Sequence, residues 1–212
     1  MLESLGLQKP AFLKTFFPVS ARARISLETL LDHHKVPRGL PWVVINPSAS
    51  CPSKYWPANK FGELVKVLGE RYEAAFLVLG TLKDHPLVEK LRRRAEFPLY
   101  DLTGRLSLGM LGALLEKSSL LISNDSGPVH VASAVGTPVI SLFGRNQPGL
   151  SPTRWKPLGP KARVIWKKIG CDPCLAHQCE IHFLCLDAIS VEEVADEARD
   201  FLEPLKKKAL VS

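Results

Sequence analysis

The sequence predicts an α/β fold built on one Rossmann-like, doubly wound parallel sheet. Two observations predict it: short continuous apolar runs recur along the chain, and amphipathic segments of about 10–14 residues separate them. Strands buried on both faces have no polar side, so a parallel sheet is expected to give such uninterrupted runs. The 212 residues, 46% hydrophobic and 23% charged, suit one large core and exclude collagen-like, mostly disordered and disulfide-scaffold chains.

The predicted elements alternate regularly from residue 42 onwards. Strands are expected over residues 42–45, 75–79, 99–102 (a weaker run), 120–122, 138–143 and 163–166. Apolar residues at helical spacing predict helices around residues 25–31, 61–68, 108–115, 127–135 and 191–205. We expect Ser107 and Ser190 to be the N-caps of the third and fifth of these helices, with Glu193 at the capping-box position of the fifth.

These elements divide the chain into three segments. Residues 1–40 are apolar and broken by prolines, which is typical of a connector that packs on something and not of a self-contained domain. Residues 41–205 carry the alternating pattern and form the Rossmann-like domain. Residues 206–212 form a basic tail, which begins with lysines that suit the negative end of the last helix dipole.

Charge and cysteine content narrow the partners and the compartment. Lys and Arg outnumber Asp and Glu by 28 to 21, so an anionic partner is expected. Nucleic acid is disfavoured, because the basic residues come without interleaved aromatic side chains or a known binding motif. Five cysteines, an odd number, indicate a reducing compartment. No secretory signal is visible and no apolar run approaches the roughly 20 residues that cross a bilayer, so we expect a cytoplasmic protein.

The most informative turn follows the fourth predicted strand. Ser126, Gly127 and Pro128 are expected to open a helix there, and the free N–H groups at its start form an anion site. Asp125 would repel a phosphate, so it is better suited to accept hydrogen bonds from sugar hydroxyls or from the turn itself. His130 lies one turn into the helix and can point back toward a ligand. The alternative is a capped helix with a core-facing histidine.

Two further turns carry candidate ligand groups. After the first strand, small polar residues including Ser50 precede Lys54, whose ammonium group would lie over a phosphate; a solvated loop lysine is the alternative. After the second strand, Asp84 is either a ligand-binding group or a helix N-cap. In an open parallel sheet these turns meet at the carboxyl ends of the strands, where ligands bind.

A cluster of cysteines lies near the carboxyl-terminal end of the domain, at Cys171, Cys174, Cys179 and Cys185. The Cys-x2-Cys spacing of the first pair permits a tetrahedral zinc site, but the later gaps are looser than in most zinc sites. Reduced thiols or an occasional disulfide in a packed loop are therefore expected, with structural zinc as the weaker alternative.

A basic strip precedes the cysteine cluster, since residues 151–170 contain six lysines and arginines and no acidic residue. Such a strip can face a phosphorylated lipid or the anionic surface of a membrane. The alternative is an ordinary solvated face, which is the commoner fate of a run of like charges.

Taken together and in this order, these stretches resemble the carboxyl-terminal half of glycosyltransferase family 9, the bacterial lipopolysaccharide heptosyltransferases. The matching stretches are INPSAS at 45–50 with SKYWP at 53–57, DLTGRLS at 101–107, SNDSGPVHVA at 123–132, and GTPVI at 136–140 continuing to LFG at 142–144. The cysteine segment and GTLKDH at 80–85 look most like the heptosyltransferase II branch. Each stretch alone is weak, but the ordered set is specific and covers about residues 42–205.

The resemblance implies the second Rossmann-like domain of a GT-B fold, holding a nucleotide sugar, ADP-heptose, without a required cofactor. Lys54 would bind the donor diphosphate and Asp125 the heptose. Ser126 and Gly127 would donate hydrogen bonds to the phosphates, and His130 would support the same site. The full implied donor-binding set is Ser50, Lys54, Asp84, Asp125, Ser126, Gly127 and His130.

The sequence departs from the family pattern in two ways. Many relatives carry a glutamate that can bind ribose where the nearest acidic residue here is Asp84, so the resemblance leaves ribose recognition open. Relatives also place a glycine-rich acceptor loop and the catalytic base, an Asp, in an amino-terminal domain for which this chain has no room. Residues 1–40 resemble the end of that domain and its linker, and no catalytic residue is identified in this chain.

The function implied is that of an inverting glycosyltransferase, present as its donor-binding half, that transfers heptose from ADP-heptose to the inner core of lipopolysaccharide. One alternative is a catalytically inactive nucleotide-sugar-binding module or partner subunit that needs an amino-terminal domain from another chain. Another is a Rossmann-like domain with an unrelated anionic ligand. The implied partners are a nucleotide sugar, the lipopolysaccharide core, a complementary chain and the inner face of the cytoplasmic membrane.

Overall fold

Six strands form one all-parallel sheet in the order β3-β2-β1-β4-β5-β6. The computed structural model describes residues 6, 15–147, 149–171, 174 and 176–203, so the predicted basic tail lies outside the described residues. The strands are β1 (Trp42–Asn46), β2 (Ala75–Val78), β3 (Leu99–Asp101), β4 (Leu120–Asn124), β5 (Val139–Phe143) and β6 (Ala162–Trp166). All six predicted strands are confirmed, with ends that differ by one or two residues.

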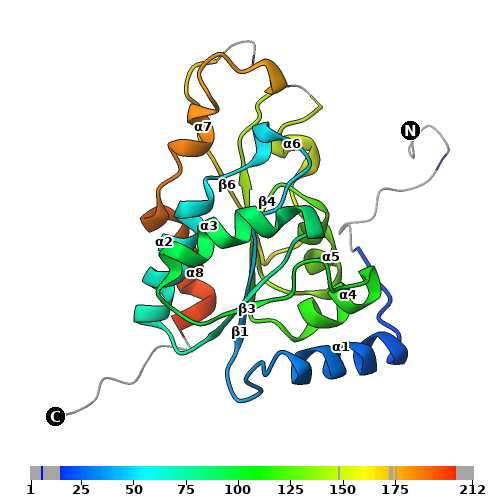
Figure 1. Cartoon of the computed structure of the whole chain (residues 1–212). Helices are drawn as coiled ribbons and strands as arrows, with labels where there is room; N and C mark the ends of the chain where they lie inside the picture. The colour runs from blue at the N-terminus through cyan, green and yellow to red at the C-terminus, as the bar shows by residue number, and fades with distance from the viewer. Residues whose placement is uncertain (1–5, 7–14, 148, 172–173, 175, 204–212) are drawn as a thin grey trace.

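Helices cover both faces of the sheet, as a doubly wound fold requires. The α-helices are α1 (Ala21–His33), α2 (Ala58–Arg71), α3 (His85–Ala95), α4 (Leu108–Lys117), α5 (Gly127–Val135), α6 (Pro152–Trp155), α7 (Leu184–Asp187) and α8 (Val191–Leu202), and the 3-10 turns are η2 (Pro52–Lys54), η3 (Leu82–Asp84) and η4 (Ala176–Gln178). Figure 1 shows α2, α3 and α8 on one side of the sheet and α1, α4 and α5 on the other. Within the described ranges, no helix is long and apolar enough to cross a membrane.

The sheet separates two apolar cores. Successive residues of a strand point to opposite faces, so Val43 and Ile45 of β1 join the core under α2 and α8, while Trp42 and Val44 join the core under α1 and α4. Every residue of β1, β2, β4 and β5 is buried. This burial on both faces explains why the strands appear in the sequence as continuous apolar runs.

The predicted helix caps are confirmed. The Ser107 hydroxyl accepts a hydrogen bond from the backbone N–H of Met110 at 3.3 Å, and the Ser190 hydroxyl accepts one from the N–H of Glu193 at 3.1 Å. The Glu193 carboxylate itself pairs with Lys167 Nζ at 2.8 Å, beyond the end of β6. The last helix is thereby tied to the edge of the sheet.

The helix α1 packs against α4 and belongs to the domain core, with Leu27 and Leu31 fully buried. Its N-cap is Ser20, whose hydroxyl accepts a hydrogen bond from the N–H of Ala23. The described part of the first 40 residues is therefore docked on the Rossmann-like domain. The domain boundary at residue 40 stays a prediction.

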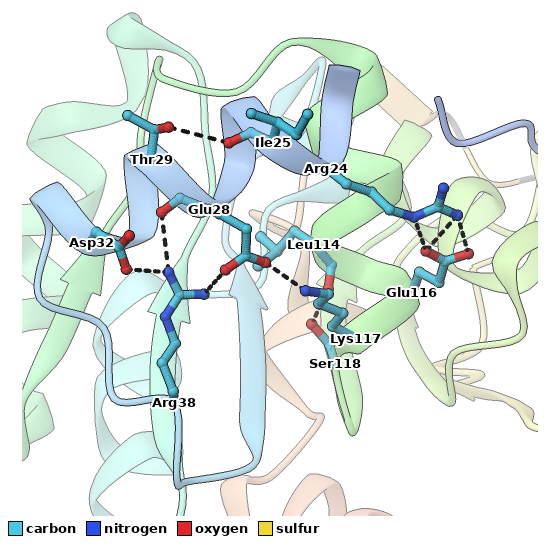
Figure 2. A network of polar contacts seen from close by, with 10 residues as sticks. All are labelled: Arg24, Ile25, Glu28, Thr29, Asp32, Arg38, Leu114, Glu116, Lys117 and Ser118. Carbon is cyan, nitrogen blue, oxygen red and sulfur yellow. Dashed lines mark hydrogen bonds and ion pairs between the residues drawn. The ribbon is translucent and has the colours of Figure 1, made fainter. Parts of the chain in front are cut away.

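A network of ion pairs surrounds the contact between α1 and α4 (Figure 2). Arg24 forms two hydrogen bonds of 3.0 Å to the carboxylate of Glu116 on α4. Glu28 accepts from Lys117 of α4 and from Arg38, each at 2.5 Å. Because these pairs are partly exposed to solvent, each contributes little, and the buried leucines carry most of the stability of the contact.

Candidate functional site

The predicted ligand-binding turns meet at the carboxyl edge of the sheet. The strand order reverses at β1, which lies between β2 and β4, and a crevice opens at such a point in doubly wound folds. A cavity of about 450 Å³ lies there. Its polar lining is Asn46, Ser48, Ser50, Thr81, Ser107 and Ser126, and its apolar lining includes leucines 79, 106, 108 and 111. Two predicted residues, Ser50 and Ser126, therefore line one cavity.

The start of α5 is held in place from β1. Asn46 Nδ2 donates to the hydroxyls of Ser123 at 2.9 Å and Ser126 at 2.8 Å, which fixes the loop between β4 and α5. The helix opens at Ser126 and Gly127 as predicted; Ser126 occupies the N-cap position, but its side chain makes no capping hydrogen bond. Gly127 is exposed, and a Cβ added there would meet nothing within 4 Å. This open space leaves room for a ligand at the positive end of the helix.

Lys54 and Asp125 come together across the crevice. Lys54 Nζ lies 2.9 Å from Asp125 Oδ2, and the two side chains are only 16% and 5% exposed. The alternative of a solvated loop lysine is therefore wrong. The loop that carries Lys54 also reaches the end of β4, where the N–H of Trp56 donates to Asn124 Oδ1 at 3.1 Å.

A second cation, Arg145, shares the same carboxylate oxygen, and the sequence interpretation missed it. Arg145 Nη2 lies 3.3 Å from Asp125 Oδ2, and the arginine side chain is 7% exposed. It follows β5, the next strand along the edge of the sheet beyond β4. The signal available in the sequence was its place, two residues after a predicted strand, in a turn that carries no motif.

The structure places His130 on the outer face of α5. The neighbouring Val129 and Ala132 are fully buried, whereas His130 is exposed. The alternative of a core-facing histidine is therefore wrong. His130 remains one turn from the open start of α5, where a ligand-supporting role stays a prediction.

Asp84 is used inside the protein, in a capping box. Its Oδ2 accepts hydrogen bonds from the backbone N–H of Thr81, the Thr81 hydroxyl and the Ser48 hydroxyl, each at 2.7 Å. Burial alone would raise the pKa of Asp84, but the hydrogen bonds from Thr81 and Ser48 outweigh it and hold this pKa below its usual value. Asp84 caps η3 and makes no cap bond to α3. It thereby orients Ser48 and Thr81, which line the cavity.

The substitution Asp84→Asn is expected to lower the free energy of unfolding at pH 7 by about 1–3 kcal/mol, because a neutral amide oxygen accepts these hydrogen bonds more weakly than a carboxylate oxygen. The folded-state pKa is depressed, so the contribution of the carboxylate is present above its unfolded value near 4 and is lost as the pH falls through the folded value. Urea denaturation of both proteins at pH 7 and near pH 3 should therefore show a gap that narrows in acid. The exposed Asp200→Asn is the control, and an equal loss in both variants would contradict the capping role.

The cysteine segment packs against the residues that neighbour Lys54 and Arg145. Cys185 donates its S–H to the carbonyl oxygen of Gly144 at 2.8 Å, and burial raises the pKa of that thiol. A Cβ at Gly144 would lie 2.7 Å from the carbonyl oxygen of Ser53 and 2.6 Å from Leu186, so only glycine allows this close packing. The Ser53 hydroxyl also lies 3.3 Å from His177 Nδ1. The segment thus supports the residues beside Lys54 and Arg145.

No zinc site is assigned to the four clustered cysteines. Each is a half-buried cysteine that forms no disulfide with another described residue. Over the part of the chain that the structure describes, no three His, Cys, Asp or Glu side chains form a group that could hold a metal ion. The weaker alternative of structural zinc gains no support from these residues.

Part of the basic strip is neutralised within the domain. Lys167 pairs with Glu193 at 2.8 Å, and Arg163 pairs with Glu197 at 4.0 Å. Both glutamates lie on α8. Lys156 and Lys161 are exposed.

The chain resembles known glycosyltransferases in sequence and in structure. The family model of glycosyltransferase family 9 (heptosyltransferase) matches residues 12–184. Lipopolysaccharide heptosyltransferase 3 of Escherichia coli K12 is 39% identical over 105 residues, which are 49% of this chain and 30% of that protein. Lipopolysaccharide heptosyltransferase 2 of the same strain is 32% identical over 119 residues, 54% of this chain and 32% of that protein.

The structure of ADP-heptose lipopolysaccharide heptosyltransferase II of E. coli superposes with a TM-score of 0.71 and 25% sequence identity. The match covers 95% of this chain but only 57% of that one. The alignments with the two curated relatives likewise cover 30% and 32% of those proteins, so the chain spans well under two thirds of their length.

Proposed function

The chain belongs to glycosyltransferase family 9, and we propose that it is the donor-binding half of a heptosyltransferase. In this proposal the reaction is an inverting transfer of heptose from ADP-heptose to the inner core of lipopolysaccharide. The two curated relatives described above are both lipopolysaccharide heptosyltransferases. The solved structure that covers 95% of this chain is described as an ADP-heptose heptosyltransferase.

The observation that carries the proposal is the Lys54–Asp125 pair beside the open start of α5. The donor diphosphate would accept hydrogen bonds from Lys54 and from the Ser126 and Gly127 end of the helix. Asp125 would accept hydrogen bonds from heptose hydroxyls. The cavity of about 450 Å³ next to Ser126 has the size and mixed lining that a nucleoside requires.

The remaining predicted residues would frame this donor. Ser50 lines the mouth of the cavity, and His130 lies on the exposed side of the α5 start. Asp84 would act through Ser48 and Thr81, which it holds against the cavity, and not by a free carboxylate toward ribose. This assignment gives every predicted donor-binding residue a place at one edge of the sheet.

The proposed chemistry divides between two domains. A base removes the proton of the acceptor hydroxyl, that oxygen forms a bond to the anomeric carbon of heptose, and the bond from that carbon to the diphosphate breaks. Lys54 and the start of α5 would stabilise the charge that develops on the departing diphosphate. Asp125 and Asp84 are both committed to hydrogen bonds or ion pairs here, so neither suits the role of base. We therefore assign the base to an amino-terminal domain.

The acceptor side of the proposal involves a membrane surface. A lipopolysaccharide core is carried on a lipid, so transfer would take place at the inner face of the cytoplasmic membrane. The exposed basic residues Arg154, Lys156 and Lys161 would face its anionic lipids.

Calorimetric titration of the purified chain tests the donor site. We expect ADP-heptose and ADP to bind and UDP-glucose to bind at least about tenfold more weakly, while the chain alone shows no transfer. Addition of an amino-terminal domain in trans should then produce transfer. A folded chain that binds all of these nucleotides equally, or none of them, would contradict the proposal, and turnover by the chain alone would contradict the assignment of the base.

A further inference from the structure

Asp125 forms ion pairs with two cations, a lysine and an arginine. Lys54 Nζ and Arg145 Nη2 both reach the same oxygen, Oδ2, at 2.9 Å and 3.3 Å. The three side chains are 16%, 5% and 7% exposed for Lys54, Asp125 and Arg145. The trio carries a net charge of +1 in a place that water barely reaches. A single carboxylate does not require two buried cations, so a second anion is expected to occupy this place during function.

Arg145 is fixed, whereas Lys54 is able to move. A lysine ammonium is a compact charge on a flexible chain, while a guanidinium is a planar fork that holds one geometry. Arg145 follows directly on Gly144, which is packed between the backbone of Ser53 and the side chain of Leu186. Lys54 ends the short turn η2 and is the more exposed of the two cations.

Burial of the Arg145 side chain also carries a free-energy cost. Its Nε–H is buried and has no hydrogen-bond partner among the residues that the structure describes. An unpaired buried donor is unfavourable, so arginine at this position is not explained by stability alone. A functional demand for a second positive charge next to Asp125 accounts for it.

The two cations would have separate tasks when a donor binds. A diphosphate at the start of α5 competes with Asp125 for Lys54, because phosphate and carboxylate oxygens attract the same ammonium group. If Lys54 moved away from a carboxylate with no other partner, the site would hold an uncompensated buried charge. Arg145 removes this cost, since it stays on Asp125.

We propose that Arg145 is a positioning residue of the donor site: it holds Asp125 in place and oriented toward the sugar when Lys54 moves from Asp125 to the donor diphosphate. The inference rests on the proposed function and extends it to a residue outside the predicted donor-binding set. It assigns recognition of the diphosphate to Lys54 and recognition of the sugar to the pair of Asp125 and Arg145. The preference for ADP-heptose over ADP should therefore depend on Arg145, while affinity for ADP itself should not.

The test is calorimetric titration of the full chain with ADP and with ADP-heptose. In Arg145→Gln we expect the affinity for ADP-heptose to fall by about tenfold or more, as for loss of a charge-assisted hydrogen bond, and the affinity for ADP to change by less than about threefold. Arg145→Lys keeps the charge and should recover part of the preference. The matched control is Arg71→Gln, which should change neither affinity. Arg71 is exposed and is the last residue of α2.

A double-variant cycle with Asp125→Asn isolates the pair. Once the carboxylate is gone, Arg145→Gln should have no further effect on the ratio of the two affinities. If Arg145→Gln does not fold, Arg145→Lys is compared with the unmodified chain instead. A smaller change in the ratio of the two affinities is then expected. Thermal melting of each variant identifies such a case.

Each other outcome identifies which idea is wrong. Equal weakening of ADP and ADP-heptose in Arg145→Gln would make Arg145 a phosphate ligand, and unchanged affinities for both would leave it without a role in the site; either overturns the inference while the proposed function stands. An unmodified chain that binds ADP and ADP-heptose equally overturns the inference alone, and one that binds neither overturns the proposed function and the inference with it.

Discussion

Lys54→Ala is expected to weaken ADP binding by about 10- to 100-fold, the range that corresponds to one lost charge-assisted hydrogen bond. The lysine lies 2.9 Å from Asp125 and close to the open start of α5, and the proposal moves its ammonium group onto the donor diphosphate. Adenosine, which has no phosphate, should bind both proteins with nearly equal affinity. Calorimetric titration with ADP, AMP and adenosine measures the three differences.

Lys54→Ala should change the free energy of unfolding much less than it changes the affinity for ADP. After Lys54→Ala, Asp125 still has Arg145 as a counter-ion at 3.3 Å, so no uncompensated carboxylate is left in the site. Lys66→Ala is the matched control: it removes the same charge and an exposed ion pair with Glu96 on the far side of α2. Unchanged ADP affinity in Lys54→Ala, or an equal loss in Lys66→Ala, would remove Lys54 from the donor site.

The fold could be predicted because its signals are local. The four inner strands are buried on both faces, so each gives a mostly apolar run, and the connecting helices have one apolar face. Caps such as Ser107 and Ser190 are recognised from their own position in the chain. The turns at the carboxyl ends of the strands follow from the topology, and this placed Lys54, Asp125 and Ser126 in one region.

The pairing within the site could not be predicted, because it depends on distances between turns. The sequence places Arg145 just after a strand, but it does not show that Arg145 binds the carboxylate of Asp125 while Arg154, nine residues later, is exposed. Asp84 has a side chain of the kind that binds ligands, yet its Oδ2 already accepts hydrogen bonds from Thr81 and Ser48. The position of His130 was ambiguous for the same reason, since one helical turn carries both buried and exposed residues.

Trp56→Ala is expected to lower the free energy of unfolding by about 3–5 kcal/mol, the range for removal of a large buried aromatic side chain. Trp56 is fully buried and packs edge-to-face on Phe61, with ring centroids 4.8 Å apart. Its Nε1–H donates to the carbonyl oxygen of Ile189 at 3.0 Å, in front of α8. Trp56→Phe keeps most of the packing and loses this hydrogen bond, so a loss of about 1–3 kcal/mol is expected, measured by urea denaturation.

The control for Trp56 is Trp155 on α6, which is 42% exposed and contributes little to either core. Trp155→Ala should change the free energy of unfolding by less than about 1 kcal/mol, and a loss as large as that of Trp56→Ala would contradict the assignment. The consequence reaches the site, because Trp56 lies two residues after Lys54 and its backbone N–H bonds to Asn124, the neighbour of Asp125. The core that stabilises the domain therefore also sets the distance between the lysine and the aspartate.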